Sequence, residues 1–486
     1  MAGRTQAELI GLSATEVVDL LDRGEVSPFE LVEAAEARIR EVEPSLNALP
    51  TTCFERARSH AEALMRGERS EARGEPGWLG GLPVAIKDLT EVAGVRTTYG
   101  SPIYRDYVPE ESHPVVKRIE RLGGIVIAKS NTPEFGAGGS TFNEVFGRTR
   151  NPWNTALTPG GSTGGGAAAL AAGEVWLAHG SDHAGSLRRP ATYCSVVGLR
   201  PSAGRVTRGF NGNLFSAASV QGPMGRTVAD VALFLDTMTG LCPSDPLTFA
   251  APAVSFTESL ASAVPPRRIG FTADFAGSIP VDGETREICA AAARAFEALG
   301  ATVEEADLSL EGLEAAFLAL RSQHYVVAHA DRLESHRDLI KPDIIWNTER
   351  GLEQPASVLG QAERDRTAFY RRVAAIFETH DILVTPGSAT PAFDVELRMP
   401  AEIDGRKLEN YVGASLITGA ISMLGLPALA VPCGLDRFGR PVGLQLVGRH
   451  RGEAALLGAA HLLMQQTGWD RAVPIDPRER SVPGSA

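Results

Sequence analysis

The chain has 486 residues, of which 43% are hydrophobic and 22% charged, and its formal net charge is −12. This is the composition of a globular protein, and the acidic balance does not favour nucleic acid or an anionic membrane as a partner. No apolar run is long enough for a signal peptide or a transmembrane helix, so we expect a cytoplasmic protein without membrane association.

The first half of the chain is predicted to begin with helices. Two capping boxes, Ser13–Glu16 and Ser27–Glu30, mark helix starts. Two short apolar runs, Val84–Ile86 and Ile125–Ala128, then predict buried strands, with a helix around Val115–Leu122 between them. Next comes a glycine-rich stretch that leads into an alanine-rich helix, and the apolar run in "VWLA" at 175–178 predicts a further strand.

Strands and helices continue to alternate in the second half. Arg267–Phe275 predicts a strand that is followed by a helix and another strand, and residues 308–380 are mostly polar and helical. The last strands are predicted in "DILVTP", "PALAVPCG" and "GRPVGLQLVGR", the last of them antiparallel after the turn "DRFG". This order predicts an α/β fold, an α/β/α sandwich around a large mixed, mainly parallel sheet, with 308–380 as a variable helical cap over the substrate pocket.

The stretch "TPGGSTGGGAAALAAG" at 158–173 allows several interpretations. A phosphate-binding Walker loop requires a lysine, and no lysine lies between Lys129 and Lys341. A dinucleotide-binding loop follows a strand directly, and the residues before this loop do not predict one. Gly160–Gly164 matches the GxSxG pattern of a nucleophile elbow, but a proline-containing loop precedes it and the downstream histidines lie mostly in polar helical sequence. None of these interpretations is favoured.

Three segments taken together predict a different chemistry. They place Lys87 at the end of an apolar strand, Ser162 in "GGSTGG" and Ser186 in "SDHAGSLRRPA". A serine is a poor nucleophile without a base, and a lysine can be that base only when burial lowers its pKa and keeps it neutral. Ser162 could relay a proton between the other two side chains, and backbone N–H groups of the turn before Ser186 could form an oxyanion hole.

These segments, in this order, resemble the amidase signature family. Gly160–Gly165 matches the family's Gly-Gly-Ser-[Ser/Thr]-Gly-Gly loop, and Asp182–Pro190 matches its turn Asp-x-Gly-Gly-Ser-[Ile/Val]-Arg-x-Pro. Flanking segments such as "AKSNTPEF", "VGLRPSAGRV" and "GLPALAVPCG" extend the resemblance over nearly the whole chain, most weakly from 240 to 380. The resemblance implies one domain over residues 1–486, with a mixed sheet of about eleven strands.

The resemblance also implies a Ser-cisSer-Lys triad. In it Ser186 is the nucleophile, Ser162 is the bridging serine on a cis peptide bond, and Lys87 is the general base. The resemblance implies that the backbone N–H groups of His183, Ala184, Gly185 and Ser186 form the oxyanion hole. It implies that Asp182, Arg188 and Thr163 support the site through hydrogen bonds. It also implies that Gly136 and Ala137 line the substrate pocket. Ala184 departs from the family pattern, where glycine is usual, and would be strained if its position required a positive φ.

The predicted function is that of an amidase that hydrolyses the C–N bond of a small, apolar or aryl, linear amide through an acyl-enzyme. No metal or cofactor is implied, and the five cysteines form no CxxC pair. A carbamate (urethane), aryl-acylamide or ester hydrolase with the same triad is one alternative, and the glutamine-hydrolysing subunit of a tRNA-dependent amidotransferase is another. The expected partner is a small-molecule amide or carbamate, and the sequence leaves open whether the chain is a monomer or a homodimer.

Overall fold

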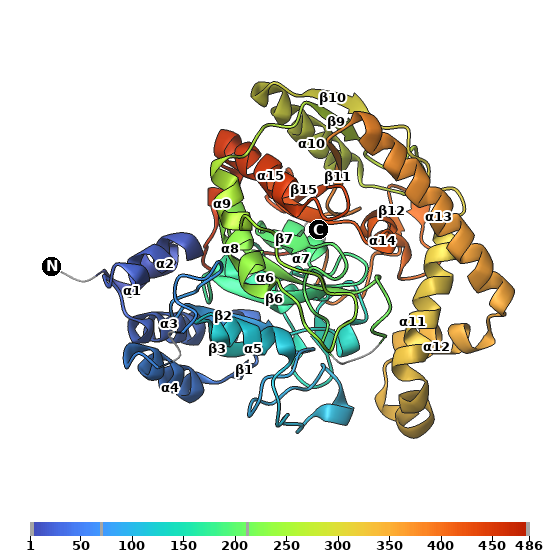
Figure 1. Cartoon of the computed structure of the whole chain (residues 1–486). Helices are drawn as coiled ribbons and strands as arrows, with labels where there is room; N and C mark the ends of the chain where they lie inside the picture. Colours follow the sequence, from blue (N-terminus) through green and yellow to red (C-terminus); the bar gives the residue numbers. More distant parts are fainter. Residues whose placement is uncertain (1–3, 69–70, 210–212, 483–486) are drawn as a thin grey trace.

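A computed structural model describes residues 4–68, 71–209 and 213–482 (Figure 1). Its centre is an eleven-stranded sheet with the order β1-β3-β2-β6-β8-β7-β14-β15-β11-β9-β10. The strands of this sheet are β1 (Thr51–Thr52), β2 (Pro83–Lys87), β3 (Ile125–Ser130), β6 (Leu177–Asp182), β7 (Val197–Arg200), β8 (Val220–Gly225), β9 (Arg268–Phe271), β10 (Thr302–Glu305), β11 (Ile382–Pro386), β14 (Ala428–Leu435) and β15 (Pro441–Val447). Two small hairpins lie outside it, namely β4 (Phe142–Asn143) with β5 (Gly147–Arg148) and β12 (Glu402–Ile403) with β13 (Arg406–Lys407).

The strand pairing confirms the predicted mixed sheet of about eleven strands. Two blocks are parallel, β3-β2-β6 on one side and β11-β9-β10 on the other. The strands between the blocks are antiparallel to their neighbours, including the predicted pair β14 and β15. Parallel pairing is thus less dominant than expected, because strands β8, β7, β14 and β15 join the two blocks through antiparallel pairs.

The strand predicted at 175–178 lies two residues too early. β6 begins at Leu177 and continues through polar residues to Asp182, and Ser181 pairs with Gln221 of β8. The apolar pattern marks only the first part of this strand, because its second half is polar. This extension carries Asp182 to the end of the strand, next to the predicted nucleophile turn.

The helices pack around the sheet on both faces. They are α1 (Gln6–Gly11), α2 (Ala14–Asp22), α3 (Pro28–Leu46), α4 (Phe54–Met65), α5 (Pro114–Arg121), α6 (Gly164–Ala172), α7 (Arg188–Cys194), α8 (Val228–Met238), α9 (Phe256–Ala261), α10 (Gly283–Ala293), α11 (Leu313–His336), α12 (Pro342–Glu353), α13 (Ala356–Thr379), α14 (Leu416–Met423) and α15 (Glu453–Thr467). The predicted capping boxes begin α2 and α3. None of the helices within the described ranges has the length and apolar character needed to cross a membrane.

Two glycines of β8 identify the two faces of the sheet. Gly222 and Gly225 are an odd number of residues apart, so they face opposite sides. A Cβ at Gly222 would meet Leu187, immediately before α7, whereas a Cβ at Gly225 would meet Asp230 in α8. Helix α7, together with α6 beside it, therefore covers one face, and α8 covers the other.

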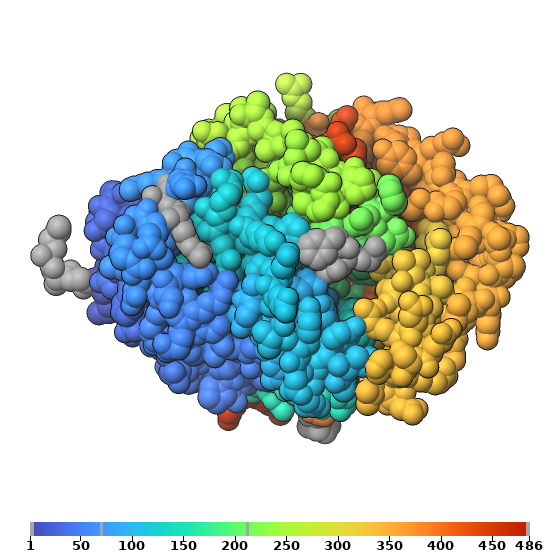
Figure 2. All heavy atoms as spheres, turned by 60° about the horizontal axis from the view of Figure 1, so that its bottom comes forward, coloured from blue at the N-terminus to red at the C-terminus, as the bar shows by residue number. Residues whose placement is uncertain are grey.

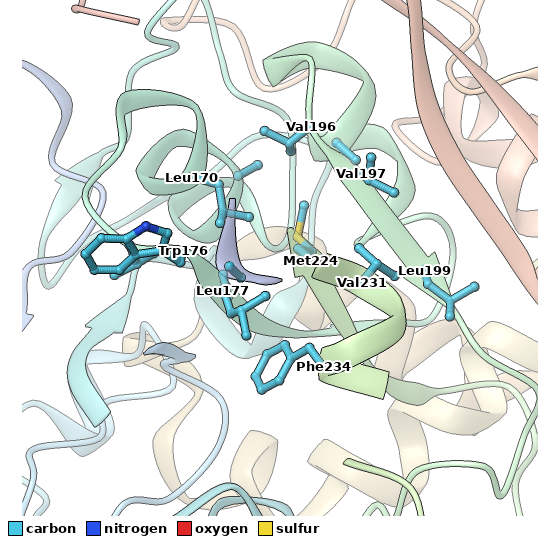
Figure 3. Close-up of a cluster of buried hydrophobic side chains, with 14 of the residues drawn as sticks. Leu170, Trp176, Leu177, Val196, Val197, Leu199, Met224, Val231 and Phe234 are labelled. Carbon is cyan, nitrogen blue, oxygen red and sulfur yellow. The ribbon is translucent and has the colours of Figure 1, made fainter. Parts of the chain in front are cut away.

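The core beneath the predicted site is continuous and apolar (Figure 3). Leu170 of α6, Leu177 of β6, Met224 of β8 and Phe234 of α8 have no exposed surface, and Trp176 is 1% exposed. Burial of side chains of this size contributes about 1.5–3 kcal/mol each to folding. The loops that follow β2 and β6 therefore extend from a closely packed base.

Helices α11, α12 and α13 form the part of the chain predicted as a cap. They stand together at one side of the molecule, away from the N-terminal helices (Figure 1). In the space-filling view the same residues, coloured yellow and orange, form a flank beside the blue-to-cyan part of the chain (Figure 2). A hydrogen bond from Arg332 Nε of α11 to the hydroxyl of Tyr104, at 3.2 Å, connects this helix to the segment before α5.

Candidate active site

Lys87 lies at the carboxyl end of β2, between the parallel strands β3 and β6. The side chain is fully buried, and its Nζ lies 2.7 Å from Oγ of Ser162, 2.9 Å from Oγ1 of Thr163 and 3.1 Å from Oγ of Ser181. Burial lowers the pKa of Lys87 from 10.5 to about 7, although the charge of Asp182 acts in the opposite direction. A substantial fraction of this amine is therefore neutral near pH 7.

The glycine loop brings Ser162 to this lysine. The peptide bond between Gly161 and Ser162 is cis, as the family resemblance implies. The hydroxyl of Thr141 donates to the carbonyl of Gly160 at 2.7 Å, and the N–H of Thr163 donates to the carbonyl of Ser186 at 3.1 Å. The loop is thus tied to the nucleophile turn by its backbone, and α6 begins directly after it.

Asp182 holds the turn that carries Ser186. Its carboxylate accepts from the N–H groups of Gly185 at 2.8 Å and Leu187 at 3.1 Å, and it pairs with Arg188 at 2.9 Å and Arg200 at 3.4 Å. Burial alone raises the pKa of Asp182, but the charges of Arg188 and Arg200 outweigh it and hold the pKa well below its usual range. Asp182 and Arg188 therefore occupy the supporting positions expected from the sequence.

The expected set of oxyanion donors needs one correction. The N–H of Gly185 is already bound to Asp182, so it is not available to a substrate oxygen. The N–H groups of His183, Ala184 and Ser186 have no hydrogen-bond partner among the residues that the structure describes. Ala184 does not adopt a positive φ, whereas Gly185 does at 110°, so alanine at 184 is not strained.

Gly185→Ala is expected to destabilise the protein by about 2–4 kcal/mol and to lower kcat/KM by about 10²-fold or more. A Cβ at Gly185 would lie 2.2 Å from Oγ1 of Thr418, and its φ is unfavourable for any L-residue. Relief of this clash must displace the turn and with it the adjacent N–H groups. Urea unfolding and steady-state kinetics measure the two effects.

Ala184→Gly is the matched control for this prediction. It changes the neighbouring residue to the one usual in the family and introduces no new atom, so we expect a stability change within about 1 kcal/mol. If Gly185→Ala matched the wild type in both measurements, the tight packing of the turn against Thr418 would be contradicted.

A cavity of about 220 Å³ opens over the two serines, and Ser162, Ser186 and Gly136 line it. A Cβ at Gly136 would lie 3.4 Å from Oγ of Ser162, so this glycine leaves room beside the bridging serine. Ala137, the other predicted pocket residue, does not line the cavity. Its side chain is fully buried in a small apolar cluster that includes Tyr325, although Gly136 and Gly138 on either side of it line the cavity.

The cavity wall comes largely from elements far away in the sequence. Helix α11 contributes Arg321, His324, Tyr325 and His329, and Tyr411 lies nearby. The sequence predicts these histidines in polar helical segments remote from a site, but a polar helix face is also what a polar cavity requires.

His183, directly after Asp182, lines the cavity but has no hydrogen bond to Ser186. Its ring stacks on His324 at 4.7 Å, and its Nδ1 lies 3.0 Å from Oγ of Ser219. Burial, with smaller contributions from His324 and Arg321, lowers the pKa of His183 well below its usual value. The ring is therefore a neutral part of the wall.

Three contributors to the site have only weak sequence signals. Ser181, which contacts Lys87, lies beside Asp182 in the polar half of a strand that the apolar pattern does not mark. Arg200 reaches the same carboxylate from β7. Thr418 donates to the carbonyl of Ala184 at 2.7 Å from α14, more than two hundred residues away. Only spatial proximity identifies the last two.

The geometry agrees with comparisons against known proteins. The model of the family described as Amidase matches residues 30–457. One relative is a glutamyl-tRNA(Gln) amidotransferase component of Moorella thermoacetica, which is 37% identical over 500 residues, with 96% of this chain and 99% of that protein covered. An acylamidase of Rhodococcus erythropolis is 34% identical over 479 residues, with 97% and 99% covered.

A solved structure shows the same architecture. The crystal structure of a bacterial aryl acylamidase of the amidase signature family superposes with a TM-score of 0.87 at 28% identity, covering 95% of this chain and 97% of that one. Together with the match of the family model, this similarity extends over the sheet, the glycine loop and the nucleophile turn. The chain belongs to the amidase signature family.

Proposed function

We propose that this protein hydrolyses the C–N bond of a small linear amide, with Ser186 as nucleophile, Ser162 as proton relay and Lys87 as general base. The observation that carries the proposal is the buried contact of 2.7 Å between Nζ of Lys87 and Oγ of Ser162, beside a cavity that both serines line. A lysine that is partly neutral near pH 7 supports this assignment, because only the neutral amine can accept a proton.

The proposed reaction proceeds through an acyl-enzyme. Lys87 takes the proton of Ser162 while Ser162 takes that of Ser186, and Oγ of Ser186 bonds to the carbonyl carbon. The N–H groups of His183, Ala184 and Ser186 stabilise the negative charge on the oxygen. Ser162 then returns a proton to the nitrogen as the C–N bond breaks, the amine leaves, and water hydrolyses the acyl-enzyme by the same proton relay.

The aromatic side chains of the cavity support an aryl or alkyl group on the substrate. Phe135, Tyr325 and Tyr411 line it together with Leu89. The same triad can act on carbamates and esters, so a carbamate hydrolase remains the nearest alternative. Helices α11 to α13 would form the cap over this pocket, since α11 supplies much of the wall.

Hydrolysis of glutamine for a tRNA-dependent amidotransferase is a second candidate, favoured by the similarity to the Moorella thermoacetica protein. Free glutamine carries an α-ammonium group, which a buried site must pair with an acidic side chain or with several acceptors. No described residue that lines the cavity is Asp or Glu. We therefore favour an amide without an ammonium group.

A substrate panel tests this choice. The purified chain is assayed with anilides, primary amides, aryl carbamates, esters and glutamine, and kcat/KM is measured for each. We expect the best amide to exceed glutamine by at least about 10²-fold, because the missing acidic partner leaves a charge unpaired. Glutamine as the best substrate would support the amidotransferase candidate, and hydrolysis of no amide would contradict the proposed activity.

A further inference from the structure

Arg189 is a buried cation without an acidic partner. It is 4% exposed and lines the cavity three residues after Ser186, and within the described residues its guanidinium forms one hydrogen bond, at 3.4 Å to the carbonyl of Ala414. No ion pair to it exists within the described residues. The neighbouring Arg188, in contrast, pairs with Asp182 and also donates to Thr418, Gln445 and Ser422. Most of the hydrogen-bonding capacity of the Arg189 guanidinium is therefore left for a ligand.

Arg321 presents a second guanidinium to the same cavity. Its partners are neutral: the hydroxyls of Tyr325 at 2.7 Å and Tyr411 at 2.9 Å, and Oδ1 of Asn347 at 3.2 Å. The nearby Asp343 lies within 4 Å of two other cations, Lys341 at 3.7 Å and Arg398 at 3.9 Å. The tyrosine and asparagine contacts fix the orientation of Arg321 without neutralising its charge.

The cavity therefore has an excess of positive charge. Arg189, Arg208 and Arg321 line it, and no described lining residue is acidic. Arg208 also donates to loop carbonyls, which gives it a structural task that the other two lack. Buried charges are normally paired, because removal of a charge from water costs several kcal/mol that only a counter-charge offsets. Neither Arg189 nor Arg321 has an ion-pair partner within the described residues, so a bound anion would supply a counter-charge that both lack.

We propose that the substrate carries a carboxylate, which Arg189 and Arg321 bind in the cavity while Ser186 attacks the amide. This inference rests on the proposed amide hydrolysis and names its substrate class. The planar guanidinium matches a carboxylate with two parallel hydrogen bonds. Arg189 occupies the position that the family's turn Ser-[Ile/Val]-Arg-x-Pro leaves open, as expected for a residue that sets substrate choice rather than chemistry.

Two pairs of isosteric substrates test the inference. The first pair carries the charge on the acyl side: glutaryl-4-nitroanilide and its terminal carboxamide. The second carries it on the amine side: N-acetyl-4-aminobenzoate and the matching benzamide. In at least one pair we expect kcat/KM for the carboxylate to be about tenfold higher or more, mainly through KM. A ratio of one or less in both pairs would overturn the proposal.

Variants of the two arginines provide a second test of the carboxylate site. Arg189→Gln and Arg321→Gln are each expected to reduce the preference for the carboxylate at least about threefold, whereas Arg371→Gln, on the exposed surface of α13, retains it. Arg189→Lys keeps the charge without the planar fork and is expected to retain part of the preference. A preference that survives both glutamine variants would contradict the assignment to these residues.

Binding measurements separate this proposal from the proposed activity. Calorimetric titration of Ser186→Ala with each member of a pair reports affinity without turnover, and it also applies if an arginine variant fails to fold. Tighter binding of the carboxylate, with no hydrolysis by the wild type, would contradict the amidase activity alone. Hydrolysis of both members with equal affinity would contradict the carboxylate subsite alone.

Discussion

Ser186→Ala is expected to lower kcat/KM for amides by at least about 10⁴-fold, because no other group can form the acyl-enzyme. The turn that positions Ser186 is held by backbone and carboxylate contacts to Asp182 that do not involve the serine hydroxyl. The variant should therefore fold normally, with a thermal midpoint close to that of the wild type. Stopped assays with an active-site titrant and a melting curve measure both properties.

Ser415→Ala is the matched control for the nucleophile. Ser415 lines the same cavity, and no hydrogen bond joins it to Lys87. Loss of its hydroxyl is expected to change kcat/KM by less than about tenfold. Amide hydrolysis by Ser186→Ala at the wild-type rate would contradict the assignment of the nucleophile, as would equal losses in the two variants.

The positions of the central residues could be predicted from the sequence because local patterns fix them. Lys87 ends an apolar run that can only be a buried strand, so its burial follows from its neighbours. Ser162 and Ser186 lie in glycine-containing turns whose residues match a family pattern. Strands β2 and β6 are parallel neighbours, so Lys87 at the end of β2 and the turn with Ser186 after β6 lie at the same edge of the sheet.

The walls of the cavity could not be predicted in the same way. Arg321 and His324 lie on a helix whose polar face looks solvent-exposed in the sequence, and only the packing of α11 against the body turns that face inward. The stacking of His324 on His183 joins residues about 140 positions apart. No periodicity or spacing carries that information, because α11 is placed by tertiary contacts.

Two predictions failed for local reasons that residue types do not reveal. Gly136 and Ala137 look equivalent as small pocket residues, but Gly136 lines the cavity whereas the side chain of Ala137 is buried in an apolar cluster. The N–H of Gly185 looks like an oxyanion donor, yet Asp182 accepts it. In both cases a local contact decides the outcome, namely the apolar neighbours of Ala137 and the carboxylate that accepts from Gly185.

After Ser186→Ala, the largest loss of activity is expected from substitution of Lys87. Lys87→Met is expected to lower kcat/KM by about 10²–10⁴-fold, which is the usual contribution of a general base. Methionine fills a similar volume and removes an amine whose burial is unfavourable in its charged form, so the thermal midpoint should stay equal or rise. Lost activity with unchanged or increased stability separates a catalytic role from a structural one.

Lys87→Arg tests whether a positive charge alone is sufficient. Arginine stays protonated at all working pH values, so it can donate to Ser162 but cannot accept its proton. We expect activity as low as that of Lys87→Met. An arginine variant with near wild-type activity would show that the group at position 87 acts as a cation rather than as a base.

The pH profile of the wild type provides the independent measurement. The neutral fraction of Lys87 rises as pH increases through about 7, so kcat/KM should rise with pH and level off above that value. At pH 5, about two units below this pKa, roughly one lysine in a hundred is neutral, and kcat/KM should fall about a hundredfold. Because His183 and His324 have lowered pKa values, they stay neutral over most of this range and do not reproduce such a curve. A flat profile between pH 5 and 8, for a protein that remains folded, would exclude Lys87 as the base.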